Sequence, residues 1–164
     1  IAANLLWMSP FWHRKDYGRI ADDSRIVSAL SDLPSGQYMV PSMDWSKASA
    51  EQRQAVQNGP VGLLVVRNPG REFSFPVALV SYFVYTLVIS LFVAYIAGVT
   101  LPAGTHYLRV FRVAGSAGVL AYSFISVGDT IWYGKPWPAT IKTVIDGVIY
   151  GLLIAGTFGW LWPR

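Results

Sequence analysis

The chain is predicted to be an α-helical integral membrane protein with three complete transmembrane helices, the end of a first one and a small α+β extramembrane domain. Three observations predict this class. The stretch from Phe73 to Thr105 contains no Asp, Glu, Lys, Arg or His. Hydrophobic residues make up 53% of the chain and charged residues 13%, whereas soluble domains are about a quarter charged. Aromatic residues account for 15%, and Trp and Tyr are common at membrane interfaces.

Composition and motifs exclude several classes of function. The chain has no cysteine, which removes disulfides, thiolate nucleophiles and cysteine-ligated metals. The net charge is +4 and its Lys and Arg residues are scattered, so we expect no nucleic acid partner. The motifs of nucleotide-binding proteins, serine hydrolases and zinc proteases are absent. His13 and His106 lack a second ligand at a suitable spacing, so we predict no metal site. We also predict no cofactor, with ligation of a haem or chlorophyll-type centre by His106 as the alternative, and no catalytic residue, because no catalytic motif is present.

Residues 1–12 are predicted to be the end of a first membrane helix. The apolar run that begins at Ile1 ends at Met8, before Ser9 and Pro10, and is too short to cross a bilayer. In this interpretation Trp7 and Trp12 lie at the membrane interface. The alternative is a short amphipathic segment on the membrane surface.

Residues 13–74 are predicted to form the small α+β domain, because positive and negative side chains are balanced there. Helical spacing follows the capping residues Asp22 to Ser24, and Ser46 or Ser49 caps a second helix. Each helix precedes a short β-rich run, at residues 37–40 and 61–66. We expect the two strands to pair with the helices against them. So small a unit is expected to lean on the membrane part or on a partner.

Residues 75–164 are predicted to hold the three transmembrane helices, at about 76–99, 108–133 and 139–162. At ~1.5 Å per residue the first of these is ~36 Å long, and a hydrocarbon layer is ~30 Å thick. The second has charged residues only near its ends, such as Arg112 and Asp129. The third ends in a tryptophan-rich segment that is typical of an interface anchor.

Small residues recur every four positions along these helices and predict close helix packing. Such stripes let two backbones approach each other in lipid. Packing within the bundle and docking onto another subunit are both compatible with them. The stripe of the last helix is Gly147, Gly151, Ala155 and Gly159, that of the preceding helix includes Ala114 and Gly118, and that of the opening helix is Ser90, Ala94 and Gly98.

Three ionisable residues, Asp129, Lys142 and Asp146, are expected to form an intramembrane polar cluster near one membrane face. Lys142 and Asp146 are four residues apart and therefore lie on one side of their helix. A lone carboxylate within a membrane is costly and needs a partner. A structural ion pair and a proton path or ligand site both fit this pattern.

Several short segments resemble a group of small uncharacterised bacterial membrane proteins. The resemblance implies four spanning helices with a soluble insertion after the first, and it brings no activity or cofactor. It lies in the segments Ser28-Ala29-Leu30-Ser31-Asp32-Leu33, Gly36-Gln37-Tyr38-Met39-Val40-Pro41 and Gly59-Pro60-Val61-Gly62, in Asp129-x-x-Trp132-Tyr133 and in Asp146.

The predicted function is that of a non-catalytic accessory or structural subunit of a larger membrane complex, with a photosynthetic or respiratory host. Its expected partners are the lipid bilayer and other membrane protein subunits. The alternative is a small transporter or enzyme that uses Asp129, Lys142 and Asp146. We expect a bacterial inner membrane location, with the soluble domain outside the cytoplasm because Arg109 and Arg112 mark the opposite loop as cytoplasmic. The basic residues of the soluble domain argue for the reverse orientation.

Overall fold

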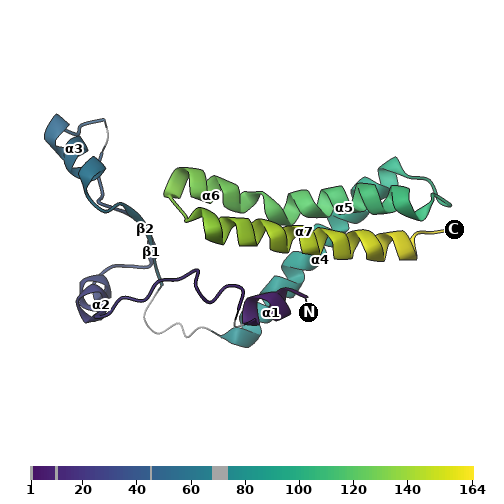
Figure 1. The fold of residues 1–164 in the computed structure, drawn as a ribbon, viewed down its shortest axis with the longest axis horizontal. Helices are drawn as coiled ribbons and strands as arrows, with labels where there is room; N and C mark the ends of the chain where they lie inside the picture. Colours follow the sequence, from purple (N-terminus) through teal and green to yellow (C-terminus); the bar gives the residue numbers. More distant parts are fainter. Residues whose placement is uncertain (1, 10, 45, 68–73) are drawn as a thin grey trace. The chain divides into compact units, whose positions relative to one another are not determined.

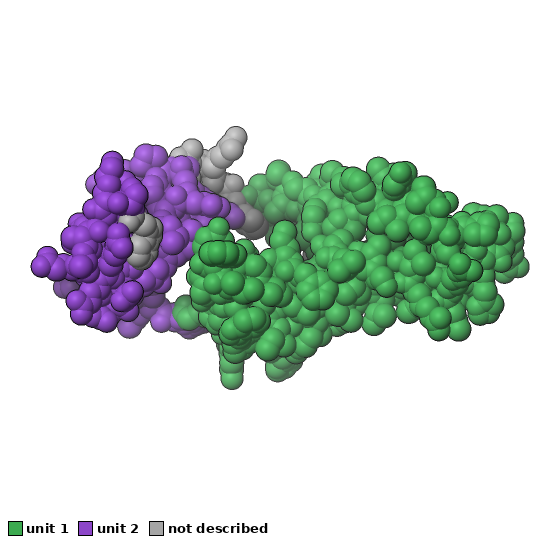
Figure 2. All heavy atoms as spheres, turned by 90° about the horizontal axis from the view of Figure 1, so that it is seen from above, with its two compact units in different colours: residues 1–18, 74–164 green, residues 19–73 purple. Residues whose placement is uncertain are grey.

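The computed structural model describes residues 2–9, 11–44, 46–67 and 74–164. The chain divides into two compact units, which are coloured separately in Figure 2. Unit 1 combines residues 1–18 with residues 74–164, and unit 2 is formed by residues 19–73. Residues 13–18 thus belong with the helical part, whereas the predicted boundary lies at residue 13.

Unit 2 has the predicted order of helix, strand, helix and strand. Its elements are α2 (Ser24–Ser31), β1 (Gly36–Val40), α3 (Ala50–Asn58) and β2 (Gly62–Val66). The two strands form one antiparallel pair, with Tyr38 opposite Leu64 at its centre.

Local side-chain hydrogen bonds mark the starts of the helices of unit 2, although only α3 has a side-chain cap. Ser49 caps α3, and a capping box joins it to Gln52, whose backbone N–H donates to the Ser49 hydroxyl. Ahead of α2, the Asp22 carboxylate accepts from the backbone and hydroxyl of Ser24. These contacts lie within a few residues, which is why the sequence predicts them.

Unit 2 has no buried interior among its described residues, contrary to the expectation that its helices pack against the sheet. None of its described residues is buried, in either the helices or the strands. Apolar strand residues stay exposed, among them Met39 (46%) and Val65 (59%). A two-stranded ribbon is too small to bury both of its faces by itself.

Unit 1 consists of five helices among its described residues. They are α1 (Ala2–Met8), α4 (Phe75–Thr100), α5 (Tyr107–Ser123), α6 (Ile125–Tyr133) and α7 (Trp137–Leu161). Three segments are long and apolar enough to cross a membrane, namely α4, the combined stretch of α5 and α6, and α7. In Figure 1, α5 and α6 lie along α7, and α4 crosses them at an angle.

The structure agrees with the predicted spans except for an interruption in the second one. The stretch predicted at 108–133 is broken at Phe124, between α5 and α6. The break follows Ser123, whose hydroxyl donates to the Val144 carbonyl of α7 at 3.2 Å. Ser123 also lies against Gly147, so the interruption coincides with a very close approach of the two helices.

Small residues form the interface between α5 and α7. A Cβ added to Gly151 would lie 2.6 Å from the backbone nitrogen of Val119, and one added to Gly115 would lie 2.9 Å from the Ala155 Cβ. Ala114 and Ala155 are completely buried. Larger side chains would push the backbones apart, so the glycines permit this distance.

In contrast, α4 is attached to the other helices near its C-terminal end. Only Val93 and Ala97 of α4 are buried. Ala97 forms a small core with Leu101 and with Val110 of α5. The remaining surface of α4 is almost wholly apolar and uncovered.

Hydrogen bonds at both ends of the helical unit fix the ends of the long helices. Gly134 ends α6 with a positive φ of 70°, a conformation that favours glycine, and its N–H donates to the Thr130 carbonyl at 3.2 Å. At the other end, the indole of Trp162 donates to the Pro102 carbonyl at 3.0 Å. The end of α7 is thereby tied to the loop between α4 and α5.

Replacing Gly151 with alanine is expected to destabilise the α5–α7 pair. The new methyl group would collide with the Val119 backbone, and overpacking of this kind costs about 1–3 kcal/mol. Thermal unfolding of the purified chain in detergent measures this loss. The matched control is Gly98→Ala on α4, where no atom lies within 4 Å of the added carbon. An equal loss in both variants would contradict the close-packed interface.

Candidate functional site

A cluster of buried charged residues joins the N-terminal segment of unit 1 to α7. His13 lies between two carboxylates, with Nδ1 2.6 Å from Asp16 Oδ2 and Nε2 2.7 Å from Asp146 Oδ2. His13 is 6% exposed and Asp146 is 2% exposed. Asp146 lies in the third turn of α7, inside a candidate membrane span, so the cluster reaches into the apolar part of the unit.

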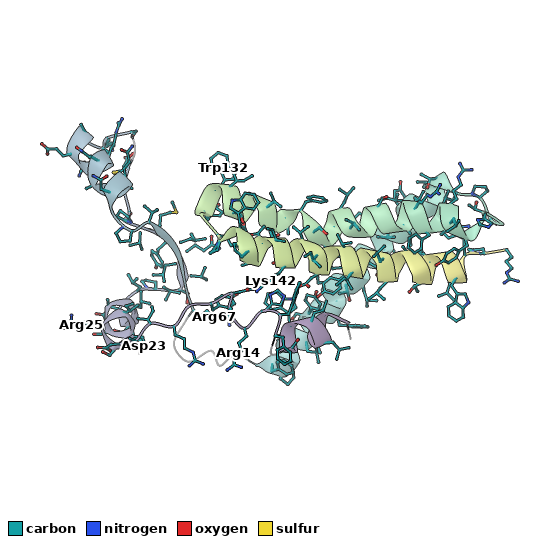
Figure 3. All side chains as sticks on the ribbon, in the orientation of Figure 1. Arg14, Asp23, Arg25, Arg67, Trp132 and Lys142 are labelled. Carbon is teal, nitrogen blue, oxygen red and sulfur yellow. The ribbon has the colours of Figure 1, made fainter. Side chains whose placement is uncertain are left out.

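Two further donors complete the cluster. The Trp12 indole Nε1 donates to Asp146 Oδ1 at 2.7 Å. The Lys142 ammonium donates to Asp16 Oδ1 and forms an ion pair with it. Figure 3 shows Lys142 on the side of α7 that faces the N-terminal segment. Each carboxylate oxygen of Asp16 and Asp146 therefore accepts one hydrogen bond.

The charges of the cluster balance when His13 is protonated. An ionised carboxylate only accepts hydrogen bonds, so two carboxylates on one imidazole are both satisfied only if both ring nitrogens donate. His13 and Lys142 then carry one positive charge each, against the negative charges of Asp16 and Asp146. Buried charges that are paired and fully hydrogen-bonded avoid most of the penalty of an uncompensated ion.

Aromatic rings enclose His13. The Trp7 indole of α1 stacks on the imidazole, with ring centroids 4.1 Å apart and planes 12° from parallel. The Trp12 ring meets the imidazole at its edge, at 6.2 Å and 77°. An indole face also attracts a cation that stacks on it.

The surroundings of Asp16 act on its acidity in opposite directions. Burial raises the pKa of Asp16, but the hydrogen bonds from Lys142 and His13, together with their charges, outweigh burial. The pKa of Asp16 consequently lies below its ordinary value of 3.8. A cleft of ≈ 240 Å³ reaches the edge of the cluster at this residue, and its lining also includes Trp7, Tyr17, Lys135 and Thr143.

Of the three residues predicted to form a polar cluster, Lys142 and Asp146 lie in one cluster and Asp129 does not. Lys142 and Asp146 face the N-terminal segment and bind Asp16 and His13 there. Asp129 of α6 is exposed and makes no hydrogen bond or ion pair with any described residue. Its place in the cluster is taken by residues from the start of the chain.

The prediction that His13 is isolated is wrong. The nearest acid in the sequence, Asp16, is three residues away, and the other, Asp146, is 133 residues away. Trp12, expected at the membrane interface, bonds to Asp146. The only sequence signal was indirect, because an intramembrane Asp146 needed a partner but nothing in the sequence named it. Among the described residues, no group of three or more His, Cys, Asp or Glu side chains could hold a metal.

The predicted helix-packing residues lie at the interface of α5 and α7 or at its ends. Gly118 faces Gly151, with an added Cβ 3.1 Å from the Gly151 Cα. Gly147 lies against Ser123, and Gly159 against the ring of Tyr107. Ala114 and Ala155 are buried there. These contacts are within the chain, and α4 keeps its own stripe of Ser90, Ala94 and Gly98 at least partly exposed.

Comparisons of the chain with protein-family models, curated proteins and solved structures found no match. The interpretation of the site therefore rests on its geometry. In that geometry every oxygen of the two carboxylates has a hydrogen-bond partner within the chain. Such a cluster fixes the N-terminal segment to α7.

Replacing Asp146 with asparagine is expected to destabilise unit 1 by about 3 kcal/mol, because it removes one of the two carboxylates that pair with His13 and leaves the cluster with one negative charge fewer. Thermal unfolding in detergent measures the loss. Asp129→Asn is the matched control, and this exposed residue is expected to change stability by less than ~0.5 kcal/mol. A double variant with His13→Gln should lose less than the sum of the single variants. Equal effects of the two aspartate variants would refute the cluster.

The low pKa of Asp16 predicts a loss of stability in acid. Because the folded pKa lies below the ordinary 3.8, Asp16 stabilises the fold at pH values above 3.8, and this contribution is lost as the pH falls through the folded value. The unfolding temperature should therefore drop below about pH 4. In Asp16→Asn it should already be lower at neutral pH and should depend less on acid. An unchanged acid dependence in that variant would argue against the ion pair with Lys142.

Proposed function

We propose that the chain is a membrane-embedded, non-catalytic accessory subunit that packs into a larger membrane complex and stabilises it. The observation that carries this proposal is α4. It is long and apolar enough to span a membrane, yet only two of its residues are buried by the rest of the chain. Its smooth edge at Ser90, Ala94 and Gly98 is suited to a second helix at close range.

Unit 2 supports the same proposal. Its β ribbon exposes apolar side chains on both faces, and no described residue of this unit is buried. In water, an uncovered apolar ribbon is typical of a surface that a partner covers. Exposed aromatic residues such as Trp132 (80%) and Trp160 (80%) offer further contact area for lipid or protein. Figure 3 shows Trp132 on α6, pointing away from α7.

The closed charge cluster favours a structural role over a catalytic one. A transporter or enzyme that uses Asp129, Lys142 and Asp146 needs these groups together and accessible to a substrate or proton. Lys142 and Asp146 instead bind residues of the same chain, and Asp129 has no link to them. Loss of transport or enzymatic activity with intact assembly in Asp146→Asn would favour the alternative.

The proposal places the chain in a bacterial inner membrane with unit 2 outside the cytoplasm. Arg109 and Arg112 near the start of α5 support this orientation, because positive residues near short loops favour the cytoplasmic side. The chain has no native cysteine, so a cysteine introduced at Gln54 reports the side of unit 2 cleanly. Failure of an impermeant thiol reagent to label it in intact cells would reverse the orientation.

Gentle detergent extraction from native membranes is expected to release the chain in an assembly much larger than its own 18.1 kDa. Gly98→Leu tests the role of α4, because the new side chain enters open space in this chain but blocks a close-packed partner. We expect this variant to keep its own thermal stability and to leave the assembly, as measured by sizing and mass spectrometry of co-purifying proteins. A chain that runs alone as a monomer or homodimer before substitution would refute the accessory role.

A further inference from the structure

An apolar groove lies between α4 and the other helices of unit 1. Its volume is ≈ 550 Å³. Most of its lining comes from α4, and α1, α5 and α7 close the rest. The lining residues are Ala3, Leu79, Val80, Tyr82, Phe83, Thr86, Ser90, Tyr122, Tyr150, Leu153 and Ile154.

Three tyrosines from three helices bring hydroxyl groups to this groove. Tyr82, Tyr122 and Tyr150 lie on α4, α5 and α7, and the rings of Tyr122 and Tyr150 are 5.5 Å apart. None of the three hydroxyls donates a hydrogen bond to a described residue. The Tyr150 hydroxyl is buried, and its neighbour Trp7 offers only an N–H donor. Among the described residues, the groove therefore contains three hydroxyl donors without an acceptor.

These donors lie deep in the proposed membrane span. Tyr150 is about 20 Å from the start of α7 and about 16 Å from its end by helix rise. Water is absent from a hydrocarbon core, so a donor there is satisfied only by protein or by a ligand. The ester carbonyls of membrane lipids lie near the interface, too far away to serve. A molecule with an acceptor that enters the core can satisfy the buried Tyr150 hydroxyl.

The volume of the groove suits a small molecule and is too small to enclose a protein helix. Ligand pockets typically measure 300–1,000 Å³, and this groove falls within that range. A helix is at least ~10 Å wide, so even twelve residues of one displace roughly 1,400 Å³. A partner helix does not fit into the groove, whereas a flat ring with a hydrocarbon tail does.

We propose that this groove binds a lipophilic quinone. The carbonyl oxygens of the ring accept hydrogen bonds from the tyrosine hydroxyls, and the ring packs against the aromatic walls. The hydrocarbon tail lies between α4 and α7, along Phe83 and Leu153. Because the Tyr150 hydroxyl is buried, binding includes a small movement of the side chains that cover it. This inference goes beyond the proposed accessory role and does not depend on it.

The test uses the full chain in lipid nanodiscs and decylubiquinone as the probe. We expect its thermal unfolding midpoint to rise with probe concentration and to saturate. Decylbenzene, which has the same tail but no carbonyl oxygen, should produce no such rise. Tyr150→Phe should weaken the apparent affinity about two- to tenfold, the value of one hydrogen bond. Without probe this variant should be as stable as the parent, because the hydroxyl it removes has no acceptor.

Two matched variants complete the test. Tyr95→Phe removes a hydroxyl from an exposed position of α4 outside the groove and should bind the probe normally. Leu153→Trp fills the groove from an exposed position of α7 and should abolish binding while the chain stays folded. Equal effects of decylbenzene and decylubiquinone, or unchanged affinity in Tyr150→Phe, would overturn the quinone proposal. So would a phospholipid that co-purifies with the parent chain and with Tyr150→Phe but is lost from Leu153→Trp.

Discussion

The helical unit depends on the neutralisation of one carboxylate, Asp146, within an apolar helix. A buried carboxylate is tolerated when it is paired and hydrogen-bonded, and here His13 and Trp12 supply both of its bonds. Lys142 and Asp16 extend the pairing, so the charges cancel within the cluster. The N-terminal segment is thereby held against α7, and α1, whose Trp7 stacks on His13, is held with it.

The second constraint is the short distance between the backbones of α5 and α7. Glycine and alanine face each other along this interface, so these helices pack at distances that larger side chains would forbid. By contrast, α4 has a single small core around Ala97 and otherwise remains uncovered. The unit therefore combines a tight helix pair with a loosely attached helix, and both the proposed partner surface and the groove follow from that difference.

Much of the fold was predictable because its causes are local. Apolar runs of sufficient length predicted the three long helices to within about two residues, and Ser46 or Ser49 was predicted to cap the helix that starts after Ser49 in the structure. The interruption at Phe124 was not predicted, because it coincides with the approach of Ser123 to Gly147 on a different helix. The candidate site was only half predicted. Lys142 and Asp146 were identified, but Asp129 was assigned to them and His13 was set aside.

The sequence by itself determined the lengths of the apolar helices, the small-residue stripes, the order of elements in unit 2 and the need of Asp146 for a partner. Each of these follows from composition and spacing within one segment. Only the tertiary structure decided that the partner is His13, more than a hundred residues away, and that three tyrosines from three helices meet at one groove. Such pairings depend on how separate helices pack together. The periodicity of a sequence describes one helix at a time and does not predict that packing.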